Sequence, residues 1–285
     1  MSRGNRVVSS GNMSTSMRDN YNQHGVGEYY RKVGVTYRNP HYPGVRRCLF
    51  AWFTSWWQQE HANIDARGPT IFDMACGVHS SKVIIALQEW WLSGLSTNNQ
   101  PTPTEITQMS IPLPRSKSHI LLPPLDSHTP RPLVMAADPY TSEAFKARTS
   151  LPCAALSFSD IAQGIMPAST SRLPLSAPAQ AATAKSKDAV SPREIIPNLV
   201  EMVICSFALH LIETPSELFA LLWELSTKCR WLVILAPHKK PQIKDGWGWS
   251  KWDTEKWSNC SMAEVQGEFL FDRVHCRVYR SLNVR

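Results

Sequence analysis

FDMACGVHSS, residues 72–81, is the stretch of sequence that decides the fold. It reads as an apolar strand that ends in Asp73, then a sharp turn of small residues, then the start of a helix. The small side chains of Ala75, Cys76 and Gly77 would let a ligand lie against the backbone, and the helix N-terminus would attract an anionic group. A carboxylate at the end of a buried strand before such a turn is typical of a nucleotide site.

The alternation of strand and helix continues along the chain. Apolar runs predict strands at 70–74, 133–137, 155–158, within 201–212, at 230–237 and at 272–282, and helical spacing predicts helices at 45–61, 80–95, 216–225 and from Thr141 onward. The last strand alternates apolar and polar residues, as an edge or antiparallel strand does. We therefore expect an α/β fold with a doubly wound, mostly parallel, Rossmann-like sheet, helices on both faces and an antiparallel strand near the C-terminus.

Composition predicts one domain with three irregular segments. Residues 1–27 are polar and basic, and disorder is expected there. The domain would span residues 28–285 and begin with an aromatic and helical arm at 28–66. Two insertions interrupt it: residues 96–132 hold eight of the 21 prolines and are expected to form a surface loop, and residues 165–194 are rich in Ala, Ser and Pro and are expected to be disordered.

Charge and cysteine content limit the class of protein. The 285 residues are 43% hydrophobic and 19% charged, as in globular proteins, and six of the seven surplus positive charges fall within the first 47 residues. A solvated basic tail is therefore favoured over a nucleic-acid surface. The seven cysteines are scattered without a C-x-x-C pair, which favours a reducing compartment and no metal site. No apolar run predicts a signal peptide or membrane span, so the expected location is the cytoplasm, with the nucleus left open.

Four blocks of the sequence, DMACG (73–77), AADPY (136–140), SFSDIA (157–162) and CSFALHLIE (205–213), together resemble class I S-adenosylmethionine-dependent methyltransferases. The first motif of that family commonly runs D-x-x-C/G-G-x-G, and His79 stands here in place of its last glycine. The chain therefore resembles a divergent member. The resemblance implies that it binds S-adenosyl-L-methionine and transfers a methyl group to an acceptor, for which a small molecule is favoured over nucleic acid.

The resemblance also assigns roles to the aspartates that end successive strands. Asp73 would orient the amino group of the cofactor or an adjoining water, Asp138 would accept hydrogen bonds from both ribose hydroxyls, and Asp160 would accept one from the adenine amino group. Taken singly, each aspartate could equally cap a helix or lie in a solvated loop. The residues expected to bind the cofactor are Asp73, Ala75, Cys76, Gly77, Asp138, Pro139, Ser159, Asp160, Ser206, Phe207, Tyr30 and Tyr37.

Several residues are candidates for binding the methyl acceptor or for removing its proton. His210 follows the fourth strand and could act as a general base, although a histidine in such a turn can equally be a packing residue. His41, His238, Lys239 and Trp249 are expected to line the acceptor pocket. The Trp-rich stretch GWGWSKWDTEKW, residues 246–257, could form a lid or an irregular cover over the edge of the sheet.

The chain lacks the motifs of two other enzyme classes. A nicotinamide dehydrogenase would carry G-x-G-x-x-G after its first strand, and a hydrolase would carry G-x-S-x-G. The stronger rival is a catalytically degenerate, methyltransferase-like protein that acts as a binding or scaffold module. His79 and the two insertions favour this rival. Asp73, Asp138 and Asp160 favour the enzyme, because all three strand ends carry a carboxylate that can accept hydrogen bonds from a cofactor.

Overall fold

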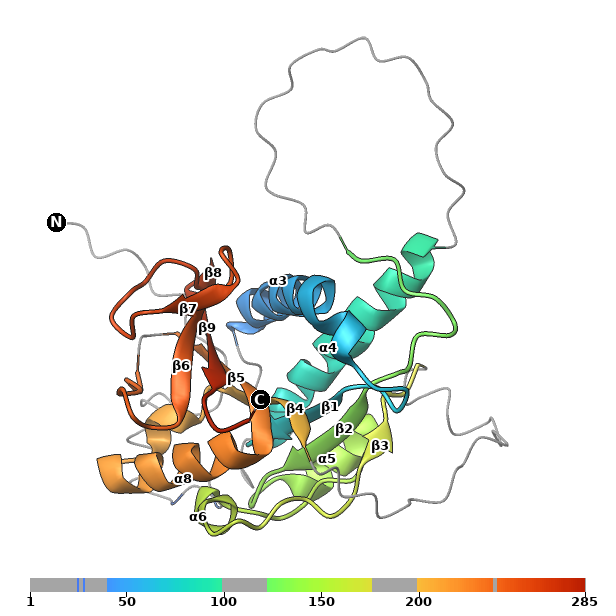
Figure 1. Ribbon diagram of the computed structural model, residues 1–285. Helices are drawn as coiled ribbons and strands as arrows, with labels where there is room; N and C mark the ends of the chain where they lie inside the picture. Colours follow the sequence, from blue (N-terminus) through green and yellow to red (C-terminus); the bar gives the residue numbers. More distant parts are fainter. Residues whose placement is uncertain are drawn as a thin grey trace, which may run out of the picture.

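A nine-stranded mixed sheet runs through the protein (Figure 1). The computed structural model describes Gly25, Glu28 and residues 40–98, 122–175, 199–237 and 240–284, without the side chains of 78–81 and 98. The strands are β1 (Thr70–Met74), β2 (Leu133–Ala137), β3 (Ser171–Arg172), β4 (Val200–Ser206), β5 (Cys229–Ala236), β6 (Trp249–Asp253), β7 (Ser258–Cys260), β8 (Phe269–Phe271) and β9 (Val274–Ser281). The helices are α3 (Tyr42–Glu60), α4 (Gly77–Asn98), α5 (Ser142–Thr149), α6 (Phe158–Ala162) and α8 (Pro215–Lys228), with 3₁₀ turns at His61–Asn63 and Leu209–Leu211.

The strand order is β3-β2-β1-β4-β5-β9-β6-β7, and β8 pairs with β9. The central strands β2, β1, β4 and β5 are parallel to one another, whereas β9 is antiparallel to both β5 and β6. The predicted α/β class and the antiparallel strand near the C-terminus are therefore confirmed. The alternating pattern predicts an edge or an antiparallel strand, and β9 is the latter: it lies inside the sheet and most of its side chains are buried.

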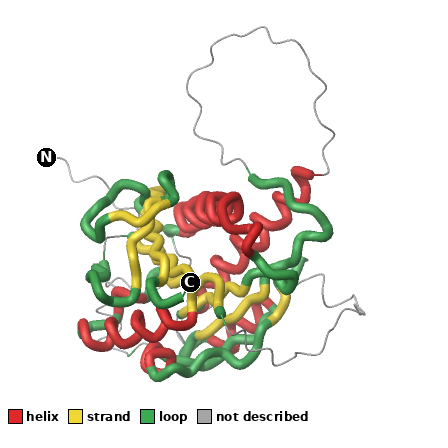
Figure 2. Tube along the Cα trace, viewed as in Figure 1, coloured by secondary structure: helices red, strands yellow, loops and turns green. Residues whose placement is uncertain are grey.

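Helices cover both faces of the sheet (Figure 2). On one face α3 and α4 pack together, and the indole N–H of Trp90 donates to the Thr54 hydroxyl over 3.0 Å. On the other face α8 covers β4 and β5 with an apolar stripe of leucines. Because burying a large aromatic side chain stabilises the fold by about 3 kcal/mol, the tryptophans are a major source of stability. Those that are almost completely buried are Trp52, Trp56, Trp90, Trp91, Trp231 and Trp249.

The predicted third strand at 155–158 does not form. Ser157 instead caps α6 in a reciprocal capping box with Asp160, and only an isolated parallel bridge joins Ala154 to Ala137. The local S-x-x-D pattern therefore overrides the apolar character of this short stretch.

The structure describes parts of both predicted insertions. Within 96–132, α4 continues to Asn98 and the buried Leu125 packs on Gly94, its N–H donating to the Gly94 carbonyl. Within 165–194, the prediction of disorder is wrong for the first part, because residues 165–175 are described and include β3 and the buried Leu173. The predicted disordered tail lies outside the described residues, apart from Gly25.

Candidate functional site

The carboxyl ends of β1, β2 and β4 meet at one edge of the sheet. In the pairing register Asp73 of β1 lies between Ala136 of β2 and Ile204 of β4. The turns that leave β1 and β4 both contain a non-glycine residue in the left-handed region, Ala75 with φ 58° and Phe207 with φ 59°. Such backbone strain concentrates at functional sites, and here two adjacent strands show it at the same edge.

Asp73 is completely buried, and neither of its carboxylate oxygens has a hydrogen-bond partner among the described residues. Burial raises the pKa of this carboxyl well above its ordinary value, and the nearby Cys153 and Asp138 raise it further. Leaving a buried polar group unsatisfied costs about 1–3 kcal/mol. A ligand or a bound water that supplies the missing partner would remove this cost.

Asp138 follows β2 and holds the turn after β1 in place. Its Oδ2 accepts a hydrogen bond from the Gly77 N–H over 2.8 Å. Its Oδ1 accepts from the N–H groups of Tyr140 and Thr141 over 2.9 and 2.7 Å. A carboxylate offers about four acceptor positions. Three are therefore occupied by the protein itself, and the pair of ribose hydroxyls that the resemblance implies would have to displace or share some of these bonds.

Asp160 takes part in the capping box at the start of α6. Its Oδ2 accepts from both the N–H and the hydroxyl of Ser157, over 2.8 and 2.7 Å, and these hydrogen bonds lower the pKa of Asp160. The preceding Ser159 is exposed. The S-x-x-D spacing thus gives the carboxylate a near partner as a helix cap, and its contact with an adenine ring stays a prediction.

Two residues at this edge were not predicted as site residues from the sequence. Cys153 places its Sγ 3.3 Å from the Sγ of Cys76, with both side chains buried beneath the turn after β1. Tyr140 is 57% exposed directly beside Asp138. Tyr140 stands in the AADPY block, but the sequence does not show that its ring is exposed. No sequence signal paired the two cysteines, which are 77 positions apart.

His41 and Phe207 come together although 166 residues separate them in the chain. Their rings stack with centroids 5.4 Å apart and planes inclined at 25°. Burial, followed by the charges of Arg273 and Lys82, lowers the pKa of His41. The structure therefore joins one predicted acceptor residue to one predicted cofactor residue at the end of β4.

The remaining predicted site residues differ in how deeply they are buried. Ser206 is half-buried as the last residue of β4, Pro139 is exposed, and His210 is exposed in the 3₁₀ turn Leu209–Leu211. Trp249 is buried in β6 and its indole N–H donates to the Leu222 carbonyl over 2.7 Å, so it is a packing residue and not part of an acceptor pocket. Within the Trp-rich stretch 246–257, residues 249–253 form β6, which pairs with β9, so this part is a strand of the sheet and not a lid. Tyr30, Tyr37, His238 and Lys239 lie outside the described residues, as does the side chain of His79.

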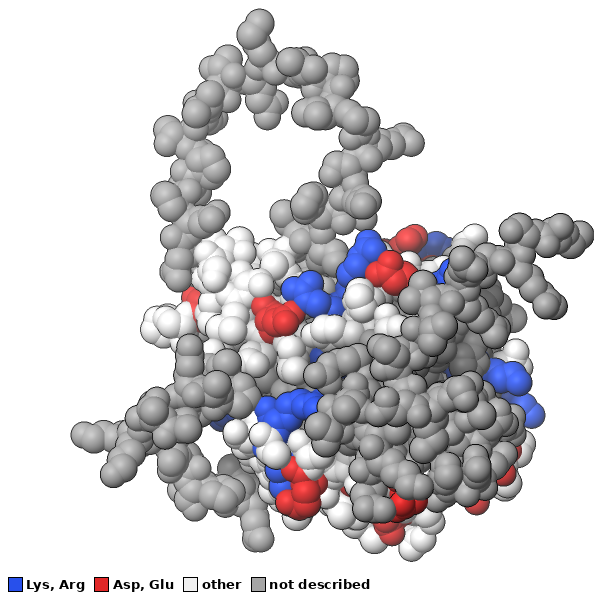
Figure 3. All heavy atoms as spheres, turned by 180° about the vertical axis from the view of Figure 1, so that it is seen from behind, with Lys and Arg blue, Asp and Glu red and all other residues white. Residues whose placement is uncertain are grey.

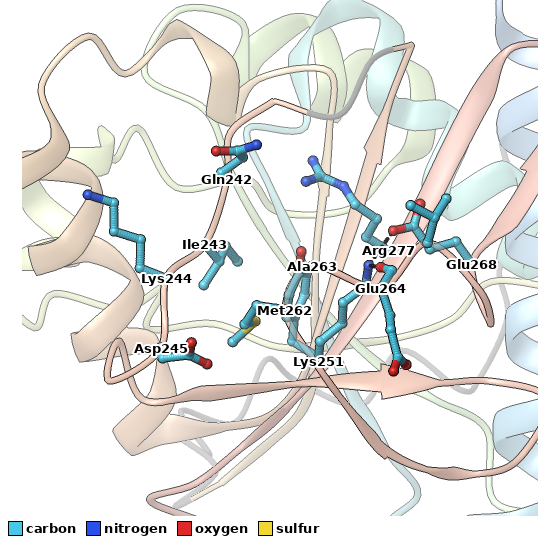
Figure 4. A pocket seen from close by; sticks show the side chains of 12 residues that line it. Gln242, Ile243, Lys244, Asp245, Lys251, Met262, Ala263, Glu264, Glu268 and Arg277 are labelled. Carbon is cyan, nitrogen blue, oxygen red and sulfur yellow. Dashed lines mark hydrogen bonds and ion pairs between the residues drawn. The ribbon is translucent and has the colours of Figure 1, made fainter.

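A pocket of about 480 Å³ lies elsewhere, between the loop after β5, β6, β9 and residues 262–268 (Figure 4). The buried Lys251 amine is 2.5 Å from a carboxylate oxygen of Glu268, and the Arg277 guanidinium donates to the Pro241 carbonyl over 2.7 Å. These charged groups tie the loops to the sheet. The pocket is on the far side of β5 from Asp73, so it is separate from the strand-end site.

The described residues show no concentration of one charge on the face in Figure 3 and neither a metal site nor a membrane-spanning helix. On the face seen in Figure 3, basic and acidic side chains are interspersed. Among the described residues, no group of three or more His, Cys, Asp or Glu could hold a metal ion, and no helix is long and apolar enough to cross a membrane.

Comparison with known proteins finds one relative over almost the whole chain. A protein of Schizosaccharomyces pombe, with the name uncharacterized protein C17A5.05c, is 35% identical over 277 residues, which are 96% of this chain and 95% of that protein. No family model and no solved structure matches the chain.

Proposed function

We propose that this chain, which belongs to one family with that S. pombe protein, binds S-adenosyl-L-methionine and transfers its methyl group to a small-molecule acceptor. The observation that carries the proposal is Asp73, whose two buried oxygens lack a partner among the described residues at the strand edge where the resemblance puts the cofactor. A bound amino group, direct or through a water, would supply the missing donor.

The arrangement of the sheet also supports the proposal. Parallel strands in the order β2-β1-β4-β5, with helices on both faces, resemble a Rossmann-like doubly wound sheet. In such sheets ligands bind at the carboxyl ends of the strands, which is where Asp73 and Asp138 lie.

The turn after β1 and Tyr140 fit the proposed cofactor as they stand, whereas the ribose contact of Asp138 requires a rearrangement. Asp73 and the small turn Ala75–Gly77 suit a ligand that approaches the backbone closely. The exposed ring of Tyr140 suits a planar base beside Asp138. Ribose binding would require Asp138 to release or share its bond to the Gly77 N–H, which links cofactor binding to a small movement of the turn after β1.

The chemistry needs little from the protein beyond positioning. When bound, S-adenosyl-L-methionine supplies a methyl group on a positively charged sulfur, which is already activated for in-line displacement. The edge of the sheet would orient the two reactants and exclude water, which can provide much of the acceleration. A side chain that accepts the acceptor's proton would add to this.

A second candidate function is a methyltransferase-like binding module that does not use the cofactor. The bonds that Asp138 and Asp160 make to their own backbone and side-chain neighbours favour it, because these carboxylates are satisfied without a ligand.

Calorimetric titration with S-adenosylmethionine and S-adenosylhomocysteine separates the two candidates. The enzyme should bind both, and Asp73→Asn and Asp138→Ala should each weaken binding by tenfold or more. Asp65→Ala is the control, because Asp65 is an exposed loop residue paired with Arg67. It should leave the affinity unchanged.

The fold of each variant is checked by near-ultraviolet circular dichroism, because Asp138→Ala also removes three hydrogen bonds in the turns. Absence of binding heat with the folded natural chain would reject the enzyme. Unchanged affinity in a correctly folded Asp73→Asn would reject the site.

A further inference from the structure

Cys76 and Cys153 form a pair of buried thiols at the edge of the sheet where β1 and β2 end. Their Sγ atoms are 3.3 Å apart, so one thiol can donate a hydrogen bond to the other. All seven cysteines of the chain are described and all are free. Among the described residues, no other two cysteines are in hydrogen-bond contact. Methyl transfer gives this contact no role.

Backbone contacts with the end of β2 hold both cysteines in place. The Cys76 N–H donates to the Ala137 carbonyl over 3.1 Å. Next to Cys153, Ala154 forms a parallel bridge with Ala137, and its carbonyl accepts from the Asp138 N–H over 2.9 Å. The sheet therefore fixes the contact between the sulfurs. In a disulfide the sulfurs are about 2.05 Å apart, and small rotations of two cysteine side chains move the sulfurs over the remaining distance.

The two thiols differ in their exposure to solvent. Cys76 is completely buried, and burial raises the pKa of its thiol well above the ordinary value, with a further rise from the hydrogen bond to Cys153. Cys153 is 6% exposed, so a small oxidant reaches its sulfur first. Because the thiolate is the reactive form and burial disfavours it, this first step should be slower than at an exposed thiol. The second step is favoured, because the partner thiol is already in contact.

A disulfide between these cysteines would join two segments that Asp138 already connects. The Asp138 N–H donates to the Ala154 carbonyl, and its Oδ2 accepts from the Gly77 N–H over 2.8 Å. Gly77 follows Cys76 in the chain, and Ala154 follows Cys153. Ribose binding by Asp138 requires the Gly77 bond to be released or shared, with a movement of the turn after β1. A covalent bond between the two sulfurs would hold this turn against the end of β2 and oppose that movement.

We propose that Cys76 and Cys153 are a redox-sensitive pair, which a peroxide converts into a reversible disulfide, and that this disulfide weakens the binding of S-adenosylmethionine. The effect on binding rests on the proposed function, whereas the formation of the disulfide does not.

The oxidation takes place in two steps. The Cys153 sulfur attacks one oxygen of hydrogen peroxide, the oxygen–oxygen bond breaks, and one water leaves, which gives a sulfenic acid on Cys153. The Cys76 sulfur then attacks the Cys153 sulfur, the sulfur–oxygen bond breaks, and the thiol proton leaves with the hydroxyl group as a second water. The two thiols lose two electrons in total, and the peroxide gains them. A dithiol reductant reverses the change by thiol–disulfide exchange.

The first experiment tests the disulfide alone. The natural chain is treated with an excess of hydrogen peroxide, remaining thiols are alkylated in denaturant, and the peptides are identified by mass spectrometry. We expect a cross-linked pair of peptides that contain Cys76 and Cys153, and its loss after dithiothreitol. Cys260→Ser is the control, because Cys260 is a half-buried thiol of β7, and it should form the same cross-link. Recovery of both residues without a cross-link would overturn the inference.

The second experiment measures binding. After removal of the peroxide, S-adenosylmethionine is titrated calorimetrically into the reduced chain, the oxidised chain and the oxidised chain treated with dithiothreitol. We expect oxidation to weaken the affinity by tenfold or more and dithiothreitol to restore it. Peroxide should not change the affinity of Cys153→Ser, which keeps every methionine of the natural chain, whereas Cys260→Ser should lose affinity as the natural chain does. Near-ultraviolet circular dichroism checks the fold of each variant.

The two experiments separate this inference from the proposed function. If the reduced natural chain does not bind S-adenosylmethionine, the proposed function fails, and the proposed effect on binding fails with it, whatever the mass spectrum shows. If the reduced chain binds, an absent cross-link overturns the inference alone. An unchanged affinity in the cross-linked chain also overturns it, as does an equal loss of affinity in a correctly folded, peroxide-treated Cys153→Ser.

Discussion

At the scale of single residues, Asp73 makes stability depend on pH. Its carboxyl has a raised pKa in the folded chain, so the folded state binds the proton more tightly than the unfolded state does. Stability from this group is present below the unfolded pKa and is lost as the pH rises toward the folded value, by up to about 1.4 kcal/mol per pH unit. We expect Asp73→Asn, without ligand, to gain stability relative to the natural chain between pH 4 and 7. Urea unfolding at several pH values measures this difference, and a constant difference would show that Asp73 is not buried as described.

Only part of the candidate site could be predicted from the types of residue in the sequence. The burial of Asp73 could be predicted because it stands inside an apolar strand, where a carboxylate is costly unless a ligand or a water binds it. Asp138 and Asp160 also follow apolar stretches, but each carboxylate accepts a local hydrogen bond from a backbone N–H three residues away, which competes with any ligand. His41 was placed in the acceptor pocket by resemblance. Its contact with Phe207 depends on how α3 docks, which a sequence pattern does not contain.

At the scale of elements, the close approach of α3 to the β8–β9 turn gives the second prediction. Gly44→Ala places a methyl group 2.5 Å from the Phe271 carbonyl oxygen, so the helix must shift. Overpacking of this kind costs about 1–3 kcal/mol. The change should also weaken the stacking of His41 on Phe207, because His41 directly precedes the helix.

Thermal unfolding measures the loss of stability, and NMR of the His41 ring measures the displacement. Gln58→Ala, at an exposed position of the same helix, is the matched control and should change neither. A Gly44→Ala chain as stable as the natural one would mean that α3 does not lie this close to the turn.

The third prediction concerns the start of α8. The Thr214 hydroxyl accepts a hydrogen bond from the Glu217 N–H over 3.3 Å and caps the helix. Thr214→Ala should therefore cost about 1 kcal/mol, measured by urea unfolding, whereas Thr214→Ser should be close to neutral. Equal losses in both variants would contradict a capping role.

Elements with a strong periodic pattern were predictable. Residues 70–74, 133–137 and 216–225 form the elements expected of them, because burial on one or both faces fixes their composition. The short stretch 155–158 was not predictable in this way, since four residues of mixed character fit a strand or the start of a helix equally well. Residues 165–175 contain several large apolar side chains, and within them Leu173 is buried and β3 pairs with β2.

At the scale of the whole molecule, β9 joins the parallel and antiparallel halves of the sheet. Val278 is almost completely buried and pairs with Val233 of β5. Val278→Asp should place an unpaired charge there and abolish cooperative folding, because such a change costs about 4 kcal/mol or more. Leu270→Asp is the control, since Leu270 of the neighbouring β8 is 56% exposed. Circular dichroism during thermal unfolding distinguishes them, and a cooperative transition in Val278→Asp would contradict the central place of β9.

The position of β9 also has a consequence during synthesis. A ribosome makes β5 and β6 well before β9, although β9 is the strand that must separate and pair with both of them. Until β9 emerges, β5 presents an open row of amide and carbonyl groups, and an open edge of this kind invites pairing with other nascent chains. The growing polypeptide therefore depends on chaperones or on rapid completion of its last strand, and pauses in translation between residues 236 and 274 should raise the aggregated fraction.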